Sequence, residues 1–210
     1  MKKYKAIIYD IDATILDTVR QNTCTLMQII KEELGIDMPY EEAALFMTNP
    51  GQRTLKLLGI QDIDTAYARW VRYVNEFEEG SPLYEGFEPV LEAFQKAGIL
   101  QGIVSSKMHA QYQIDFVSKG LDRYITTAVL AEDTPLHKPD PMPMLECLRR
   151  LQVEPQEAIY IGDAPGDQQS ARNAGVDFGY AKWGSVFPED SFQPDYVFEK
   201  PVDLLKLLEI

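Results

Sequence analysis

The chain has 210 residues, of which 45% are hydrophobic and 25% charged, and its formal net charge is -13. This length and composition suit a globular protein with one domain, or one core domain with a smaller insert, and argue against disorder. The acidic balance argues against nucleic-acid binding, because contacts to phosphates need Lys and Arg. An anionic substrate must therefore be attracted by local positive charge or by a metal ion.

Cysteine and histidine residues do not indicate a disulfide framework or a metal site. Cys24 and Cys147 lie in segments with helical patterns, where we expect small, buried, apolar roles. His109 and His137 lack the spacing of metal ligands. No transmembrane span or signal peptide is visible in the sequence. We therefore expect a cytoplasmic protein without a membrane partner, as a monomer or a homodimer.

The first 82 residues contain one short strand pattern and otherwise helical patterns. Ala6–Tyr9 is an apolar, β-prone run that predicts a buried parallel strand. Thr18–Leu34 carries apolar residues at helical spacing, and only short helical stretches follow from Pro39 to Glu79. The pattern therefore predicts a helical insert over residues 16–82.

After residue 82, helical and strand patterns alternate. We predict helices at Pro89–Ala97, Met108–Lys119, Pro141–Leu151 and Gln168–Ala174, strands at Leu100–Val104, Ile125–Leu130 and Ala158–Ile161, weaker strands at Phe178–Ala181 and Tyr196–Phe198, and a C-terminal helix through Leu208. This alternation is typical of an α/β fold with a doubly wound, Rossmann-like parallel sheet. We assign residues 1–15 and 83–210 to this core.

Polar residues follow four of the predicted strands. These are Asp10-Ile11-Asp12, Ser105-Ser106-Lys107, Lys138-Pro139-Asp140-Pro141, and Gly162-Asp163 through Asp167. In open parallel sheets, ligands bind beyond the carboxyl ends of the strands. The sequence therefore places its polar chemistry where the architecture predicts a site.

The pair Asp10 and Asp12 lies on one side of an extended segment, because side chains alternate with a period of two. One carboxylate can attack phosphorus, and the other can protonate a leaving alkoxide and then deprotonate a water. Two carboxylates this close repel each other without a nearby cation. A chance pair, or a capping turn, is the alternative for this short motif alone.

The later motifs also allow two interpretations. Asp163 and Asp167 can offer Mg²⁺ oxygen ligands, or Asp167 can N-cap a helix that begins near Gln168. Lys138 can neutralise a phosphate, or lie solvated on the surface. The hydroxyl and N–H groups of the two serines after the second strand, Ser105 and Ser106, can bind phosphate oxygens, or cap a helix.

Taken together, the motifs resemble those of the haloacid dehalogenase superfamily of hydrolases. The matching residues are Asp10-Ile11-Asp12-Ala13-Thr14, Ser105, Lys138, and Gly162-Asp163 through Asp167. The resemblance covers essentially the whole chain, with the insert as a helical cap, and is strongest to the phosphoglycolate phosphatase and β-phosphoglucomutase branch. It implies a Mg²⁺-dependent phosphatase that hydrolyses a small phosphorylated metabolite through an aspartyl-phosphate intermediate.

The resemblance implies a role for each catalytic residue. Asp10 would be the nucleophile and a Mg²⁺ ligand. Asp12 would be the general acid and base, with its backbone carbonyl on the metal. Ser105, Lys138 and the Ser106 amide would hold the phosphoryl group.

The resemblance also implies a metal site and exposes two departures from the family pattern. Asp163 would bind Mg²⁺, Asp167 would support the metal or its waters, and Thr14 would order the first loop. The family usually has Gly at the position of Ala13, where we expect a backbone φ compatible with Ala and retained activity. The family often has Ser or Thr at the position of Ala164, so this chain lacks one possible hydrogen bond to the metal site.

The cap is expected to select the substrate. The segment Asn49-Pro50-Gly51-Gln52-Arg53 resembles a cap loop, and Arg53 could bind a carboxylate or a second phosphate, or be an exposed helix residue. A sugar phosphomutase of similar build is an alternative function. A phosphorylatable receiver-like module is another, although Asp10 follows the first strand rather than a later one, and a degenerate enzyme that serves as an interaction protein is a third.

Overall fold

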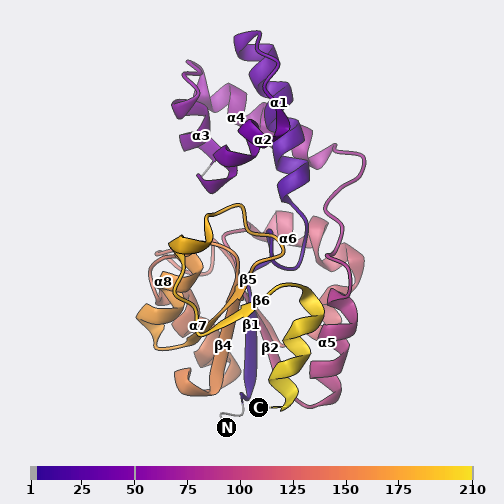
Figure 1. The fold of residues 1–210 in the computed structure, drawn as a ribbon, viewed down its shortest axis with the longest axis vertical. Coiled ribbons are helices and arrows are strands. Elements are labelled where there is room, and N and C mark those ends of the chain that lie inside the picture. Colours follow the sequence, from indigo (N-terminus) through magenta and orange to yellow (C-terminus); the bar gives the residue numbers. More distant parts are fainter. Residues whose placement is uncertain (1–3, 50, 210) are drawn as a thin grey trace. The chain divides into compact units, whose positions relative to one another are not determined.

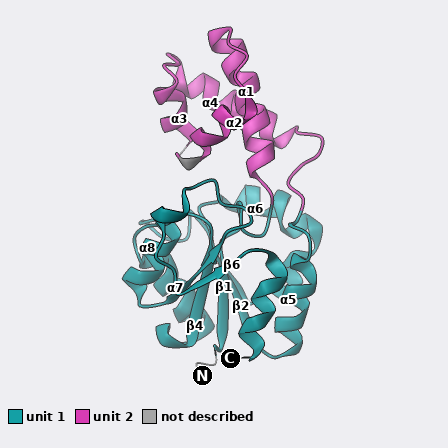
Figure 2. Ribbon diagram, in the orientation of Figure 1, with its two compact units in different colours: residues 1–16, 83–210 teal, residues 17–82 magenta. Residues whose placement is uncertain are grey.

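The structure is a computed structural model that describes residues 4–49 and 51–209. The chain divides into two compact units, which consist of residues 1–16 with 83–210, and of residues 17–82 (Figure 2). The chain leaves the first unit after its first strand and loop and returns to it at Leu83. Each unit has its own hydrophobic cluster.

The first unit is built on a six-stranded parallel sheet with the order β3-β2-β1-β4-β5-β6. The strands are β1 (Ala6–Tyr9), β2 (Leu100–Val104), β3 (Thr127–Val129), β4 (Ala158–Gly162), β5 (Asp177–Ala181) and β6 (Tyr196–Phe198). All residues of β1 are buried, which explains why this central strand is apolar throughout rather than alternating. The predicted α/β doubly wound fold is confirmed.

Helices cover both faces of the sheet (Figure 1). They are α5 (Phe87–Lys96), α6 (His109–Asp115), α7 (Met142–Leu151) and α8 (Pro165–Ala174), with shorter 3-10 segments η2 (Val117–Lys119), η3 (Leu121–Tyr124), η4 (Pro155–Glu157), η5 (Glu189–Ser191) and η6 (Pro201–Glu209). Ile7 and Tyr9 pack with α5, α6 and η6, whereas Ala6 and Ile8 pack with α7 and α8. The side chains of β1 thus point alternately to the two faces of the sheet and pack into two separate hydrophobic cores.

Three predicted helices have different bounds or geometry. Helix α8 begins at Pro165 instead of Gln168, because proline is preorganised for the first turn. Asp167 is therefore inside the first turn, where its carboxylate accepts the N–H of Ala164, and is not the N-cap residue. The helix predicted to extend to Lys119 ends as α6 at Asp115 and continues as η2, and the C-terminal segment η6 is a 3-10 helix.

The second unit contains only helices among its described residues, which are 17–49 and 51–82. They are α1 (Val19–Leu34), α2 (Tyr40–Ala44), η1 (Leu45–Thr48), α3 (Gly51–Leu57) and α4 (Ile63–Asn75). Trp70 of α4 is buried in the cluster formed with Leu26 and Ile30 of α1, and its indole N–H donates to Thr25 at 3.0 Å. In the described part of the chain, no helix combines the length and apolarity needed to cross a bilayer.

Candidate active site

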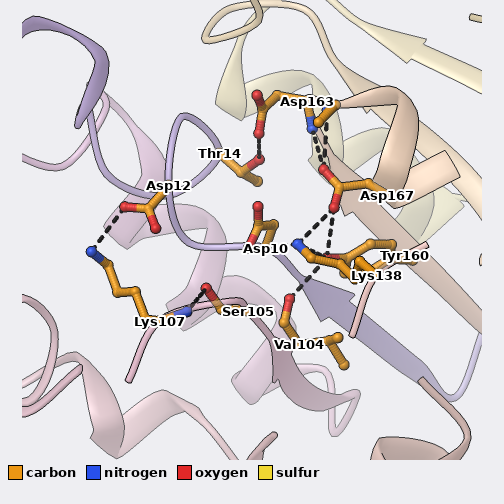
Figure 3. Close-up of polar contacts among 11 residues, drawn as sticks. Asp10, Asp12, Thr14, Val104, Ser105, Lys107, Lys138, Tyr160, Asp163 and Asp167 are labelled. Atoms are coloured by element: carbon orange, nitrogen blue, oxygen red, sulfur yellow. Dashed lines mark hydrogen bonds and ion pairs between the residues drawn. The ribbon is translucent and has the colours of Figure 1, made fainter. Parts of the chain in front are cut away.

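The register of the central strands brings the sequence motifs to one edge of the sheet. Tyr9, the last residue of β1, pairs with Ile103 of β2 and Ile161 of β4. The residues that follow these strands therefore emerge side by side. Asp10 follows β1, and its N–H donates to the Ile161 carbonyl at 2.9 Å. Figure 3 shows the polar side chains that gather at this edge.

Three carboxylates form the centre of this group. Asp10, Asp163 and Asp167 are all buried, and one oxygen from each lies within 4.8 Å of the others. Burial raises the pKa of Asp10 to about 7. The positive charge of Lys138 lowers this pKa, whereas the negative charges of Asp167 and Asp12 raise it further. Burial and the neighbouring Asp167 and Asp10 charges also raise the pKa of Asp163. Burial and mutual repulsion thus disfavour the charged forms of Asp10 and Asp163.

A divalent metal ion fits this donor set. Asp10 Oδ1 is buried without an aligned hydrogen bond, although Lys138 Nζ lies 3.1 Å away. An orphaned carboxylate oxygen beside two further buried carboxylates is chemically suited to a hard cation, because Mg²⁺ prefers oxygen ligands. A cation there would also offset the repulsion that, in addition to burial, raises the pKa of Asp10 and Asp163.

Asp167 is engaged through both of its oxygens. Oδ2 accepts the backbone N–H groups of Asp163 and Ala164 at 3.2 and 3.0 Å, which closes the loop between β4 and α8. Oδ1 accepts from Lys138 Nζ at 2.7 Å. Thr14 is fully buried, and its hydroxyl donates to Asp163 Oδ1 at 3.0 Å. These two side chains therefore orient their neighbours.

Lys138 is buried at the edge of the sheet, with only 10% of its side chain exposed. Its Nζ lies 3.1 Å from Asp10 Oδ1 and donates to the hydroxyl of Tyr160, which in turn donates to the Val104 carbonyl. Burial lowers the pKa of Lys138, but the Asp10 and Asp167 charges outweigh this and raise it above its usual value. The side chain is therefore a fixed positive charge beside Asp10, rather than a solvated surface lysine.

The other motif residues differ in exposure. Asp12 lies apart from the three carboxylates and turns toward Lys107, whose Nζ is 2.9 Å from Asp12 Oδ1 (Figure 3). Ser105 is buried, and its Oγ accepts the Lys107 backbone N–H at 3.3 Å. Ser106 is exposed.

Arg53 belongs to the other unit. It is exposed on α3, and the adjoining Pro50 of the predicted cap loop lies outside the described residues. Its contact with a substrate stays a prediction.

The expectation for the backbone of Ala13 is wrong, whereas the expected retention of activity stays a prediction. Its φ is 57°, in the left-handed region that favours glycine. The reason is a tight reversal after β1, in which Thr14, Ile15 and Leu16 all donate their N–H groups to the Ile11 carbonyl and Ala13 donates to the Leu16 carbonyl. This loop requires one residue at positive φ, and the sequence places alanine there.

Replacing Ala13 with Val is expected to lower the free energy of unfolding by about 2 kcal/mol or more, because a β-branched side chain at positive φ adds backbone strain to crowding in a buried position. Gln152, with a φ of 58°, is the matched control, because Gln152→Val has the strain without the burial. Urea denaturation of both variants separates the two contributions. An Ala13→Val protein as stable as its parent would contradict the structure of the loop.

Sequence reasoning missed a segment that follows β5. The indole N–H of Trp183 donates to the Thr14 carbonyl at 2.9 Å, and the hydroxyl of Ser185 donates to the Asp163 carbonyl at 2.6 Å. This segment thus ties the loop after β1 to the loop after β4. Its position beyond the carboxyl end of a parallel strand was the available signal, but it has no carboxylate or lysine in contact with Asp10.

Comparison with known proteins supports the resemblance. A family model described as haloacid dehalogenase-like hydrolase matches residues 7–181. The chain is 30% identical to a protein of Caldanaerobacter subterraneus provisionally named pyrophosphatase PpaX, over 99% of this chain and 96% of that protein. It is 27% identical to a phosphoglycolate phosphatase of Aquifex aeolicus, over 98% of this chain and 97% of that protein.

A solved structure gives the same result at the level of the fold. The crystal structure of a protein from Lactobacillus plantarum, provisionally described as a phosphoglycolate phosphatase, superposes with a TM-score of 0.85 and 29% identity. The match covers 98% of this chain and 99% of that one. The family match spans well over half of the chain, including the first and fourth motifs. The chain therefore belongs to the haloacid dehalogenase-like hydrolase family.

Proposed function

We propose that the protein is a metal-dependent phosphatase that hydrolyses a small phosphorylated metabolite at Asp10. The observation that carries this proposal is the buried Asp10 carboxylate, which has Lys138 Nζ at 3.1 Å and two further carboxylates beside it. Relatives named pyrophosphatase and phosphoglycolate phosphatase support the same reaction class. Such relatives make phosphoglycolate and pyrophosphate the first substrates to test.

The chemistry follows from two carboxylates with separate tasks. An Asp10 oxygen attacks phosphorus and forms an acyl phosphate while the bond from phosphorus to the ester oxygen breaks. Asp12 gives its proton to the departing alkoxide and then takes a proton from the water that attacks the acyl phosphate. Inorganic phosphate leaves, and Asp10 is regenerated as a carboxylate.

Positive charge and hydrogen-bond donors hold the phosphoryl group in this proposal. The Lys138 ammonium neutralises its oxygens, assisted by the Ser105 hydroxyl and the Ser106 amide. Tyr160 and Asp167 hold the lysine through contacts of 3.1 and 2.7 Å. The phosphoryl group is therefore expected to bind to a Lys138 ammonium that is already held in position.

Asp10, Asp163 and the backbone carbonyl of Asp12 would hold Mg²⁺, with Asp167 in support. A bound Mg²⁺ supplies charge neutralisation between the nucleophile and the anionic phosphoryl group. We further propose that residues 16–82 act as a cap and that Arg53 contributes to substrate selection through its guanidinium group.

Turnover of a panel of phosphorylated compounds tests the proposal. The panel includes phosphoglycolate, pyrophosphate and sugar phosphates, and the assay measures inorganic phosphate with Mg²⁺, with EDTA, and after Mg²⁺ is restored in excess of EDTA. We expect turnover that EDTA removes and Mg²⁺ restores, because buried carboxylates need the cation. Turnover that resists EDTA would contradict the metal requirement, and inactivity on the whole panel would contradict the proposed reaction.

A further inference from the structure

A second buried lysine lies at the site, on the side of Asp10 away from Lys138 (Figure 3). The ammonium of Lys107 is 2.9 Å from Asp12 Oδ1 and 2.7 Å from Asp115 Oδ2, and only 10% of the Lys107 side chain is exposed. The proposed reaction assigns it no role. A buried cation between two carboxylates is costly unless the geometry is well satisfied, so its position calls for an explanation.

Asp115, one of the two carboxylates that pair with Lys107, is held in place by a further hydrogen bond. Asp115, at the C-terminal end of α6, is buried, and its Oδ1 accepts from the Gln111 side chain at 2.9 Å while Oδ2 accepts from Lys107. The Lys107 backbone is also fixed, because its N–H donates to Ser105 Oγ and its carbonyl accepts the N–H of Ala131. The ammonium group is therefore anchored independently of Asp12.

Asp12, the other carboxylate that pairs with Lys107, is more exposed. The Asp12 side chain is 39% exposed, yet its Oδ1, which pairs with the Lys107 ammonium at 2.9 Å without an aligned hydrogen bond, is buried. The contact to Lys107 thus fixes one oxygen of Asp12 and leaves the other as the exposed part of the carboxylate. Proton transfer depends on such placement, because an acid or base must reach the reacting oxygen at hydrogen-bond distance.

We propose that Lys107, anchored by Asp115, is a positioning residue that fixes the carboxylate of Asp12 for proton transfer. This inference rests on the proposed phosphatase reaction. Direct binding of the substrate is less compatible with the structure, because only 10% of the Lys107 side chain is exposed and its ammonium already pairs with two carboxylates.

The leaving group separates positioning from general structural damage. An alkoxide is a poor leaving group and needs the proton from Asp12, whereas p-nitrophenolate leaves without it. The second step, attack of water on the acyl phosphate, needs Asp12 as a base whichever ester was cleaved. A protein with a misplaced Asp12 should therefore cleave p-nitrophenyl phosphate once per active site and then stall.

The experiment compares the parent with Lys107→Met, Asp115→Asn and Asp12→Asn on an alkyl phosphate and on p-nitrophenyl phosphate, in the presence of Mg²⁺. For Lys107→Met we expect kcat on the alkyl phosphate to fall at least about tenfold, but by less than the roughly 10²- to 10⁴-fold that acid–base catalysis supplies in full, because Asp12 itself is still present. We also expect a burst of one nitrophenolate per active site, followed by slow turnover. Asp115→Asn should give the same pattern more weakly, and Asp12→Asn more strongly.

Lys5→Met is the control for removal of a paired lysine. Lys5 pairs with Glu157 next to the amino-terminal ends of β1 and β4, at the edge of the sheet opposite the site, so both esters should be cleaved as by the parent. Equal losses on both esters with a reduced burst in Lys107→Met would overturn the positioning role, as would a rise in KM alone. A parent that cleaves neither ester would overturn the proposed function, and the positioning role with it.

Discussion

Replacing Asp10 with Asn is expected to reduce phosphate release by on the order of 10⁴-fold or more while the protein stays folded. The amide cannot attack phosphorus, so the first step is lost rather than slowed. The fold should tolerate the change because Asn has nearly the same volume. Removal of one of three clustered, buried carboxylates also relieves the repulsion that, in addition to burial, raises the pKa of Asp10 and Asp163.

Two measurements separate these effects. Phosphate release reports the chemistry, and thermal unfolding in EDTA reports the stability, which should be equal to or above that of the parent. Asp122→Asn is the control, because Asp122 is an exposed acid in η3 of the same unit. Full turnover by Asp10→Asn would remove Asp10 as the nucleophile. If Asp10→Asn lost turnover and also unfolded, a second substitution, Asp10→Ala, would test the role of Asp10 as the nucleophile.

The position of the candidate site could be predicted because it depends on local patterns and on one topological rule. The apolar runs that end at Asp10 and at Asp163 mark buried parallel strands, and parallel strands present their carboxyl ends at one edge. Nothing in this reasoning requires knowledge of a side chain's direction.

The contacts that organise the site could not be predicted in this way. Lys107 pairs with Asp12 across 95 residues of sequence, and Ser185 reaches Asp163 across 22. Each depends on the rotamer of a long or buried side chain and on the course of a loop, for which a single sequence carries no periodic signal. The positive φ of Ala13 could not be predicted either, because the residue type argues against the conformation that the loop imposes.

Gly184 gives the second large expected effect, because the segment after β5 passes close to the main chain of the loop after β1 at this residue. An ideal Cβ at Gly184 would lie 1.8 Å from the Ala13 carbonyl oxygen and 2.7 Å from the Tyr84 hydroxyl. The φ of Gly184 is not in the left-handed region, so space rather than backbone freedom requires glycine here. An added methyl group must displace backbone, since the nearest atom belongs to the main chain.

Gly184→Ala is therefore expected to lower the free energy of unfolding by about 2–3 kcal/mol, as overpacked substitutions do. The displaced backbone lies between the Trp183 contact to Thr14 and the Ser185 contact to Asp163, so both contacts cannot keep their present lengths. A shift of about 1 Å in the loop that carries Asp12 can cost about 10²-fold in rate. Urea denaturation and kcat on an alkyl phosphate measure the two effects.

Gly166→Ala is the matched control for this substitution. Gly166 lies in the first turn of α8 at the same edge of the sheet, and an ideal Cβ there meets no atom within 4 Å. Because alanine favours the helix by about 1 kcal/mol over glycine, Gly166→Ala should be at least as stable as the parent and retain its turnover. If Gly184→Ala behaved in the same way, the close approach to Ala13 would be refuted. If it lost stability but kept its rate, the segment after β5 would support the fold without positioning Asp12 or Asp163.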